Sequence, residues 1–505
     1  MMKVLRELIR IVNPGKLRYA QLVGQQNNSS NNADELYRLI HQSKIETDED
    51  IANHFFSAHS RKRRYTRNLK NRLRRRLMNA LFLIEPDEKS SDVQKAYFQC
   101  YRNMAGIHIL SGMGALRTFI PFADRTIKKA QLYGFTEIVL SLSRLLRRYY
   151  GEIVGDLKKY SRYANIAQQY AAILYAENLG EHYNTRVLLN FSNSRAAQTH
   201  LAEEIQTYID QMKVYRDRHK SYQLNLSYYR LCVTKFQIIA AHQEVVKNCN
   251  EAIAYFESLE RETPIAAQFF FLFQSIPSYI HLKKYDQSIT AIEKCLSMVG
   301  ANTYNYYAIL FYQIFVSFHS GRYDLAIKVL DSVPESRDIP TDNLREQWLI
   351  AEAYVHFFTD RPFKLARFLN QVPIFEQDKR GNNINILILQ TLFLLRDQRF
   401  SAIIDRMESL KQYVHRYLRK DETYRSSCFI KMLLQLPTAD FHRVAVERKV
   451  QPLLKRLQQV PLNLAHQSGE LEIVPYEMLW ERVVALLDDK FHKVRKPSNL
   501  YRSKK

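Results

Sequence analysis

The sequence predicts an all-α protein, built as a right-handed α-solenoid of antiparallel helix pairs with a basic helical region at its N-terminus. Two observations predict this class. Only 13 Gly and 14 Pro occur among 505 residues, well below their usual shares of about 7% and 5%, and long helices exclude both residues. Four segments of one pattern also recur along the chain at a nearly constant interval, which is typical of helical repeats.

Composition excludes several classes of protein. A hydrophobic content of 46% indicates a folded chain and not a disordered one. The N-terminus shows no signal-peptide pattern, and no run approaches the ~18 apolar residues of a membrane span. We therefore expect a cytoplasmic protein with no membrane span. Five scattered cysteines without a C-x-x-C pair predict neither a disulfide framework nor a zinc site, namely Cys100, Cys232, Cys249, Cys295 and Cys428.

The chain divides into four predicted regions. Residues 1–90 form a basic helical head, in which Thr47 and Asp50 have the spacing of a helix capping box. Residues 91–467 contain the helical repeats. Residues 468–490 hold a C-terminal capping helix that starts near Pro475, and residues 491–505 form a basic disordered tail.

The densest charge feature of the head runs from residue 61 to residue 76, where ten of sixteen residues are basic and none is acidic. Leu69, Leu73 and Leu77 recur at helical spacing, so one long helix with an apolar stripe and a basic back is predicted, continuing to about Ile84. The candidate anion- or partner-binding residues are Arg61, Lys62, Arg63, Arg64, Arg67, Lys70, Arg72, Arg74, Arg75 and Arg76.

Two interpretations of this helix stay open. Its cations could neutralise the phosphates of nucleic acid, with Tyr65 stacking on a base, or bind an acidic protein. Alternatively they form a solvated face or pair with acidic residues elsewhere in the chain. Like charges at i,i+4 destabilise a helix, and a purely solvated face usually includes Glu. The net charge of +23 fits attraction to polyanions.

The recurring segments cover residues 283–296, 321–333, 361–372 and 398–410. Each has an aromatic residue, then a packing residue three positions later, then an apolar stripe. The aromatic residues are Tyr285, Tyr323, Phe363 and Phe400, and the packing residues are Ser288, Ala326, Ala366 and Ile403.

The second of these segments resembles the tetratricopeptide repeat family. Gly321, Tyr323 and Ala326, followed by Leu330 and Val333, are similar to the second half of that repeat. The resemblance covers about residues 130–410 and implies paired helices that bind a protein partner. The layout as a whole also resembles large repeat proteins of Bacteroidota, a likeness that implies no function.

In the peptide-binding members of that family, the first helix of each repeat supplies Lys, Asn and Arg to clamp a carboxylate. The corresponding positions here are apolar, so such a clamp is not expected. They would form either an apolar peptide groove or, as we favour, core between the helices. These positions are Phe270, Phe273, Phe311, Phe315, Trp348, Ile388 and Leu392.

Catalytic and cofactor motifs are mostly absent from the sequence. It contains no phosphate-binding loop, no dinucleotide fingerprint, no H-E-x-x-H pair and no nucleophile elbow. His54 and His59 are poorly spaced for metal ligands, so neither a metal nor a cofactor is expected. Arg195 and His200 resemble the R-x4-H motif of helical ribonucleases of the HEPN type, although Ala196 replaces the usual polar residue.

The leading hypothesis is a non-catalytic scaffold that binds a protein partner through its repeats, aided by the basic head. The alternative is a nucleic-acid-binding regulator that uses the head and the tail. A HEPN-like ribonuclease is a remote third.

Overall fold

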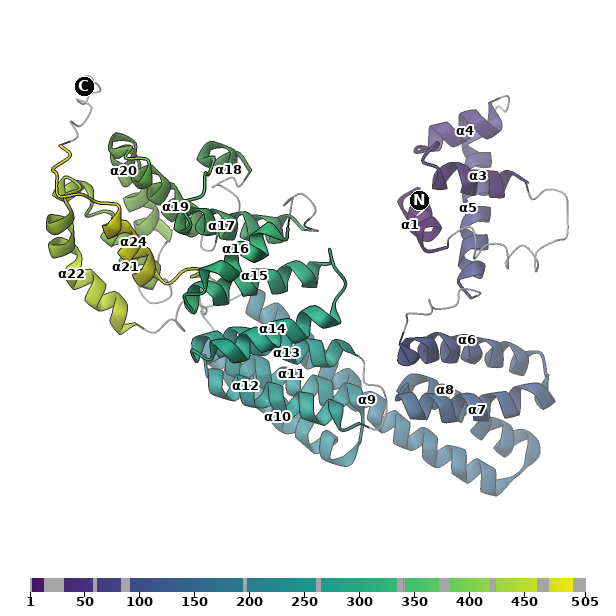
Figure 1. Cartoon of the computed structure of the whole chain (residues 1–505). Coiled ribbons are helices and arrows are strands. Elements are labelled where there is room, and N and C mark those ends of the chain that lie inside the picture. Colours follow the sequence, from purple (N-terminus) through teal and green to yellow (C-terminus); the bar gives the residue numbers. More distant parts are fainter. Residues whose placement is uncertain are drawn as a thin grey trace, which may run out of the picture. The chain divides into compact units, whose positions relative to one another are not determined.

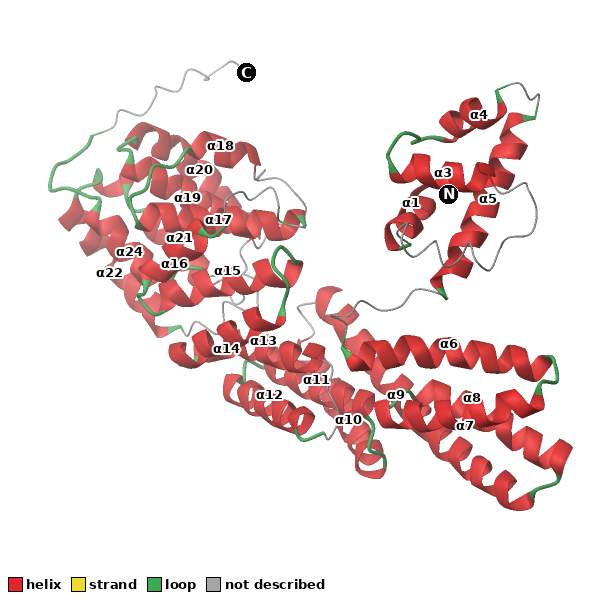
Figure 2. Cartoon of the chain, turned by 45° about the vertical axis from the view of Figure 1, so that its right-hand side comes forward, coloured by secondary structure: helices red, strands yellow, loops and turns green. Residues whose placement is uncertain are grey.

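The computed structural model describes residues 2–12, 31–57, 61–82, 91–193, 198–259, 265–333, 339, 341–371, 382–417, 424–460 and 472–493. Within these residues the secondary structure is helical, with no strand (Figure 2). Consecutive helices pack against each other along the chain (Figure 1). The all-α prediction is confirmed, and the arrangement is consistent with an α-solenoid. No described helix is long and apolar enough to cross a membrane.

The chain forms two compact units, Met1–Ala171 and Ala172–Lys505. Their boundary lies inside α9 (Leu157–Asn193), a helix of 37 residues. The boundaries predicted at residues 90, 467 and 490 differ from this one. The helix is continuous at residue 171, with neither a proline nor a polar linker nearby, so the sequence has no local signal for this boundary.

The head is a small helical cluster with its own core. It consists of α1 (Met2–Ile11), α3 (Asn31–His41), α4 (Asp48–Phe56) and α5 (Lys62–Leu81). The predicted capping box is confirmed, because Thr47 accepts from the backbone N–H of Asp50 and the Asp50 carboxylate accepts from that of Thr47. Aliphatic side chains from all four helices fill the core, among them Leu5, Leu36, Ile51, Leu69, Leu73 and Leu77.

The rest of the first unit packs around a separate apolar cluster. It contains α6 (Asp92–Gly112), α7 (Leu116–Tyr133), α8 (Thr136–Arg148), the π-helix η1 (Tyr149–Val154) and the beginning of α9. Phe119, Ile127, Ile138 and Leu142 are fully buried in this cluster.

The second unit continues with consecutive helices. They are α10 (Gln198–Arg218), α11 (Tyr222–Ile238), α12 (His242–Glu257), α13 (Ile265–His281), α14 (Tyr285–Met298), α15 (Tyr304–His319), α16 (Tyr323–Asp331), α17 (Asp342–Phe358), α18 (Leu365–Gln371), α19 (Asn382–Arg396), α20 (Phe400–Tyr417), α21 (Tyr424–Leu433), the 3-10 turn η4 (Pro437–Ala439), α22 (Arg443–Gln459) and α24 (Tyr476–Ala485).

Turns of the same geometry join the two helices of several pairs. One residue of the turn has a positive φ, which is 57° at Lys283, 72° at Gly321 and 54° at Gln398. The next residue donates its backbone N–H to a carbonyl five positions back, at 2.8–2.9 Å in all three turns, as Arg322 does to Ser317. Only one of these three turns contains glycine at the positive-φ position. The sequence alone therefore does not show that the three turns have the same geometry.

Glycine at the two non-glycine turns is expected to stabilise the second unit. Lys283→Gly and Gln398→Gly should each raise the free energy of unfolding by about 0.5–1 kcal/mol, because a left-handed conformation strains every residue with a Cβ. Denaturant titration measures the change. The reciprocal control is Gly321→Ala, whose Cβ would meet no atom within 4 Å, so any loss there reports backbone strain alone.

The recurring aromatic and packing residues have the same structural positions in three of the four segments and different ones in the fourth. Ser288, Ala326 and Ile403 are buried, and Tyr285, Tyr323 and Phe400 are each the first residue of a helix. In the remaining segment Ala366 is exposed, so its prediction as a packing residue is wrong. Phe363 lies three residues after the positive-φ residue of its turn, Asp360, where the other aromatic residues lie two after theirs. The helix begins only at Leu365, five residues after Asp360, whereas the other three helices begin two residues after their positive-φ residue. Phe368 is buried there instead.

Candidate functional site

The solvent face of α5 is lined by arginine. Leu69, Leu73 and Leu77 are buried against the other helices of the head, as the predicted stripe requires. Residues on the remaining sides of the helix point to solvent, while Lys62 is half-buried. Seven of the ten predicted binding residues are exposed, and all seven are arginines: Arg61, Arg63, Arg64, Arg67, Arg72, Arg74 and Arg75.

Two of the ten predicted residues have other roles. Lys70 is buried, and its ammonium group forms an ion pair with Asp48 of α4. Arg76 is half-buried, and its Nη1 lies 3.2 Å from Oδ1 of Asp34 in α3. These cations hold α5 against its neighbours, so Lys70 and Arg76 do not belong to the arginine face. Their partners lie 22 and 42 residues away in the chain, beyond the reach of helical periodicity.

Other acidic residues of the head are engaged away from the arginine face. The Asp50 carboxylate accepts backbone N–H groups of Glu46 and Thr47 at 3.0 and 2.7 Å, and these bonds lower its pKa. Glu35 lies 3.0 Å from Nε2 of His54. Among the residues that the structure describes, no partner forms an ion pair or hydrogen bond with the side chains of the seven arginines.

The beginning of α5 concentrates positive potential. Its first turn contains no acidic residue, and Arg61 at the N-cap position makes no side-chain capping bond. The free N–H groups of a helix N-terminus carry about half a positive charge, which Lys62, Arg63 and Arg64 increase. Acidic residues normally occupy this position because they stabilise the helix. The arrangement therefore costs stability and attracts anions.

An aromatic ring lies beside these arginines. Tyr65 stacks on Phe56 of α4 with ring centroids 5.5 Å apart, and its side chain remains 43% exposed. A partly exposed aromatic ring beside arginines is a suitable platform for a nucleobase.

The charge excess of the chain is concentrated in its first unit. Residues 1–171 contain 30 Lys and Arg against 15 Asp and Glu, whereas residues 172–505 contain 44 against 36. The smaller unit thus carries about two thirds of the net charge. This distribution favours the first unit over the second as the place where a polyanion is attracted.

The apolar positions of the first repeat helices belong to the core. Phe311, Phe315, Trp348, Ile388 and Leu392 are all buried, whereas Phe270 and Phe273 are partly buried. The core interpretation is therefore correct for the first five.

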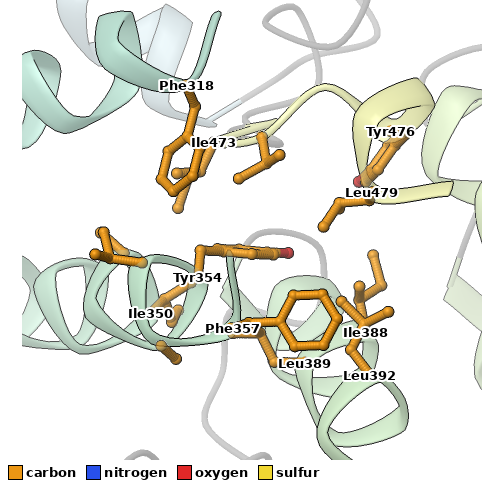
Figure 3. Packing of buried hydrophobic residues seen from close by; sticks show 14 of the residues in the cluster. Phe318, Ile350, Tyr354, Phe357, Ile388, Leu389, Leu392, Ile473, Tyr476 and Leu479 are labelled. Carbon is orange, nitrogen blue, oxygen red and sulfur yellow. The ribbon is translucent and has the colours of Figure 1, made fainter. Parts of the chain in front are cut away.

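The C-terminal segment covers part of this apolar face. In Figure 3, Ile473, Tyr476 and Leu479 converge on Tyr354 of α17 and on Ile388 of α19. The segment reaches further back, since Nε2 of His319, at the end of α15, lies 3.1 Å from the backbone carbonyl oxygen of Glu472. Residues 472–487 thus pack on earlier repeats as well as on the last helices, α21 and α22.

The first residues of the predicted tail, 491–493, have contacts with the repeats. The backbone N–H of His492 donates to the carbonyl of Asp440 at 2.9 Å, and its ring packs on Phe400. Phe491 stacks on His442. Residues 491–493 therefore belong to the folded unit, and the rest of the predicted tail lies outside the described residues.

A buried arginine ties the C-terminal segment to the repeats. Arg425 of α21 donates Nε–H to Oε2 of Glu472 at 2.8 Å, and Nη2–H to Oε1 of Glu472 and to Oε2 of Glu477, both at 2.7 Å. Its Nη1 donates to the carbonyls of Leu457 and Val460. All five N–H groups of the guanidinium are thus engaged. Sequence reasoning missed this hub, because Glu472 is 47 residues away and nothing local marks the pair.

The catalytic and metal-binding candidates fall only partly within the described residues. His200 is exposed on the first turn of α10, whereas Arg195 lies outside the described part of the chain. His59 also lies outside it. No group of three or more His, Cys, Asp or Glu among the described side chains could hold a metal ion.

A cavity of about 640 Å³ lies in the second unit, between the turns before α12 and α14 and the C-terminal segment. His242 and His281 stack in its wall with ring centroids 4.2 Å apart, and burial lowers the pKa of His242. Glu244, Glu477 and Lys283 complete a wall of mixed charge. Such a lining favours no single class of ligand.

Comparison with known proteins adds no relative to this picture. No protein-family profile, no curated protein and no solved structure matches the chain.

Proposed function

We propose that the protein is a non-catalytic nucleic-acid-binding protein whose contact surface is the arginine face of α5. The observation that supports this most is the set of seven exposed arginines without a described partner, on a helix whose first turn lacks any acidic residue. Arginine binds phosphate through two parallel N–H groups, so it suits a phosphate backbone better than lysine does.

Nucleic acid fits this surface better than an acidic protein does. The helix spans 20 residues, or about 30 Å, so its arginines can follow several consecutive phosphates. Tyr65 adds a ring beside them on which a base can stack. Binding of this kind positions the protein on nucleic acid without reading its sequence.

The helical repeats complete the proposal as a scaffold. We propose that they form the right-handed solenoid of antiparallel pairs expected from the tetratricopeptide resemblance, in a cytoplasmic protein. The apolar positions of α15, α17 and α19 that would line a peptide groove are buried. For this reason the scaffold hypothesis, in which the repeats bind a protein, ranks second here.

Charge reversal on α5 tests the proposal. Arg63, Arg67 and Arg74 lie along one side of the exposed face, and Arg63→Glu/Arg67→Glu/Arg74→Glu should weaken binding to single-stranded RNA and duplex DNA by at least about a hundredfold near ~100 mM salt. The slope of log affinity against log salt should fall by about 1 for each phosphate that the variant no longer neutralises. Fluorescence anisotropy with labelled oligonucleotides, using nuclease-treated protein, measures both quantities.

A matched control reverses three exposed arginines elsewhere. Arg443→Glu/Arg448→Glu/Arg456→Glu on α22 changes the net charge equally and should leave most of the affinity intact. A labelled poly-glutamate peptide separates the two classes of partner. Equal binding by the α5 variant and the native protein contradicts the proposal, and so does a preference for poly-glutamate over RNA and DNA.

A further inference from the structure

Two turns of the first unit hold large apolar side chains in solvent. Met113 follows α6 with 78% of its surface exposed, and Leu157 begins α9 with 75% exposed. Ile153 and Val154, at the end of η1, are 64% and 49% exposed. Single exposed apolar residues are ordinary on protein surfaces, but a group of four at two neighbouring turns requires an explanation.

The turn between α6 and α7 and the turn between η1 and α9 lie at the same end of the helical bundle. The turn at Gly134 joins α7 to α8 at one end, and Phe119 meets Tyr149 at the other, with ring centroids 5.7 Å apart. Phe119 is in the first turn of α7, just after Met113, and Tyr149 is one helical turn before Ile153. The turn before α7 and the turn after η1 therefore lie at one end of this bundle (Figure 1).

The local backbone contributes to the exposure. The chain widens into a π-helix at Tyr149–Val154, and Gly155 then takes a φ of 71°. The backbone N–H of Asp156 donates to the carbonyl of Tyr150 at 2.9 Å and closes the turn. A π-helix is less stable than an α-helix and is frequent at functional sites. The last two residues of this π-helix, Ile153 and Val154, lie outside the apolar cluster that contains Leu142 and Leu146.

Cations surround the apolar end. Arg117, Arg148 and Lys158 are exposed next to the two turns. Lys159 lies 3.6 Å from Asp156, and Glu152 is the other acidic residue nearby. Apolar side chains at a tip with cations behind them match the layers of an anionic bilayer, in which acyl chains lie beneath negative headgroups.

We propose that this apolar end, formed by Met113, Ile153, Val154 and Leu157, inserts into the interface of an anionic lipid bilayer. A bilayer fits this end better than a protein partner does, because exposed apolar side chains at two turns lie next to exposed cations. The association is peripheral, because these side chains belong to two turns and reach only the headgroup and upper acyl layers. The inference stands on a different surface from the nucleic-acid proposal and does not depend on it.

Vesicle sedimentation with the nuclease-treated full chain tests the inference. We expect binding to vesicles of phosphatidylcholine with phosphatidylserine, and much weaker binding to phosphatidylcholine alone. Ile153→Ser/Leu157→Asp should lower the partition coefficient about tenfold or more, because it removes buried apolar surface and adds a negative charge. The control Leu189→Asp places the same charge at a comparably exposed leucine of α9 and should bind like the native chain.

A tryptophan at the tip reports insertion directly. Both native tryptophans, Trp348 and Trp480, are buried, so iodide reaches neither. In an Ile153→Trp variant we expect a blue shift of emission and protection from iodide when phosphatidylserine vesicles are added. Emission that does not change overturns the proposal, and so does absence of sedimentation at low salt.

The α5 variant distinguishes this surface from the head. With Arg63→Glu/Arg67→Glu/Arg74→Glu, the blue shift at position 153 should persist. If that variant abolishes vesicle binding while Ile153→Ser/Leu157→Asp does not, the head holds the membrane and the inference is wrong. Loss of RNA binding without loss of vesicle binding leaves the inference in place.

Discussion

Replacing Arg425 with methionine is expected to lower the free energy of unfolding of the second unit by about 3–5 kcal/mol. The methionine is apolar and of similar length, so it leaves the Glu472 carboxylate buried without its cation. The carbonyls of Leu457 and Val460 lose their donors as well. Burial alone lowers the pKa of Arg425, but the bonds to its two glutamates raise it above its ordinary value, so the guanidinium stays charged.

Intrinsic fluorescence measures this loss selectively. The chain contains two tryptophans, Trp348 and Trp480, and both lie in the second unit. A denaturant titration followed by tryptophan emission therefore reports the unfolding of that unit without a contribution from the head. The exposed Arg443 supplies the control, since Arg443→Met should change the free energy of unfolding by no more than about 0.5 kcal/mol.

A double variant separates the charge from the shape. Arg425→Met/Glu472→Met removes both members of the closest pair and should cost clearly less than the sum of the single changes, because neither charge is left buried alone. Arg425→Lys keeps the charge but supplies three donors instead of five, so it should also destabilise the unit. An Arg425→Met variant as stable as the native chain contradicts the role of the hub.

Acid is expected to destabilise the second unit through His319. Burial lowers the pKa of this imidazole to about 4, from an ordinary value near 6.5. Below pH 6.5 the unfolded chain takes up a proton that the folded chain refuses. Stability is therefore lost as the pH falls from about 6.5 to about 4, by roughly 3 kcal/mol at the lower limit. The groups that face the ring include Arg425 and Glu477, besides the carbonyl of Glu472.

The variant His319→Gln isolates this contribution. A glutamine can still donate an N–H toward the Glu472 carbonyl but does not titrate. We expect the difference in free energy of unfolding between the native chain and His319→Gln to change by about 3 kcal/mol between about pH 7 and pH 4, as followed by tryptophan emission. A difference that is constant across this range would show that the imidazole takes up its proton at the same pH in the folded and the unfolded chain, and would contradict the prediction.

The position and faces of α5 follow from the sequence alone. The leucine spacing predicts a helix from residue 61 to about residue 84, and the structure has it from Lys62 to Leu81, with Leu69, Leu73 and Leu77 inside. Periodicity is sufficient here because the apolar stripe and the cations are features of one continuous helix. It could not separate Lys70 and Arg76 from the arginine face, since their partners belong to other helices.

The four recurring segments also show how far local spacing can predict packing. The spacing of aromatic residue and packing residue is local, and it places Ser288, Ala326 and Ile403 correctly inside the core. At Ala366 the same spacing fails, because the following helix begins five residues after the positive-φ residue of the turn instead of two. The spacing in the sequence counts residues along the chain. Which residues are buried depends on where the turn ends and the helix begins.

The sequence by itself determined the helical class, the repeat interval, the capping box and the cluster of arginines, because each of these is written in residues close together in the chain. The tertiary structure alone decided that residues 472–487 fold back over earlier repeats, that Arg425 holds Glu472, and that two distant turns form one apolar end. These features join residues tens to more than a hundred positions apart. Their contacts arise from how the helices pack, and no local pattern encodes them.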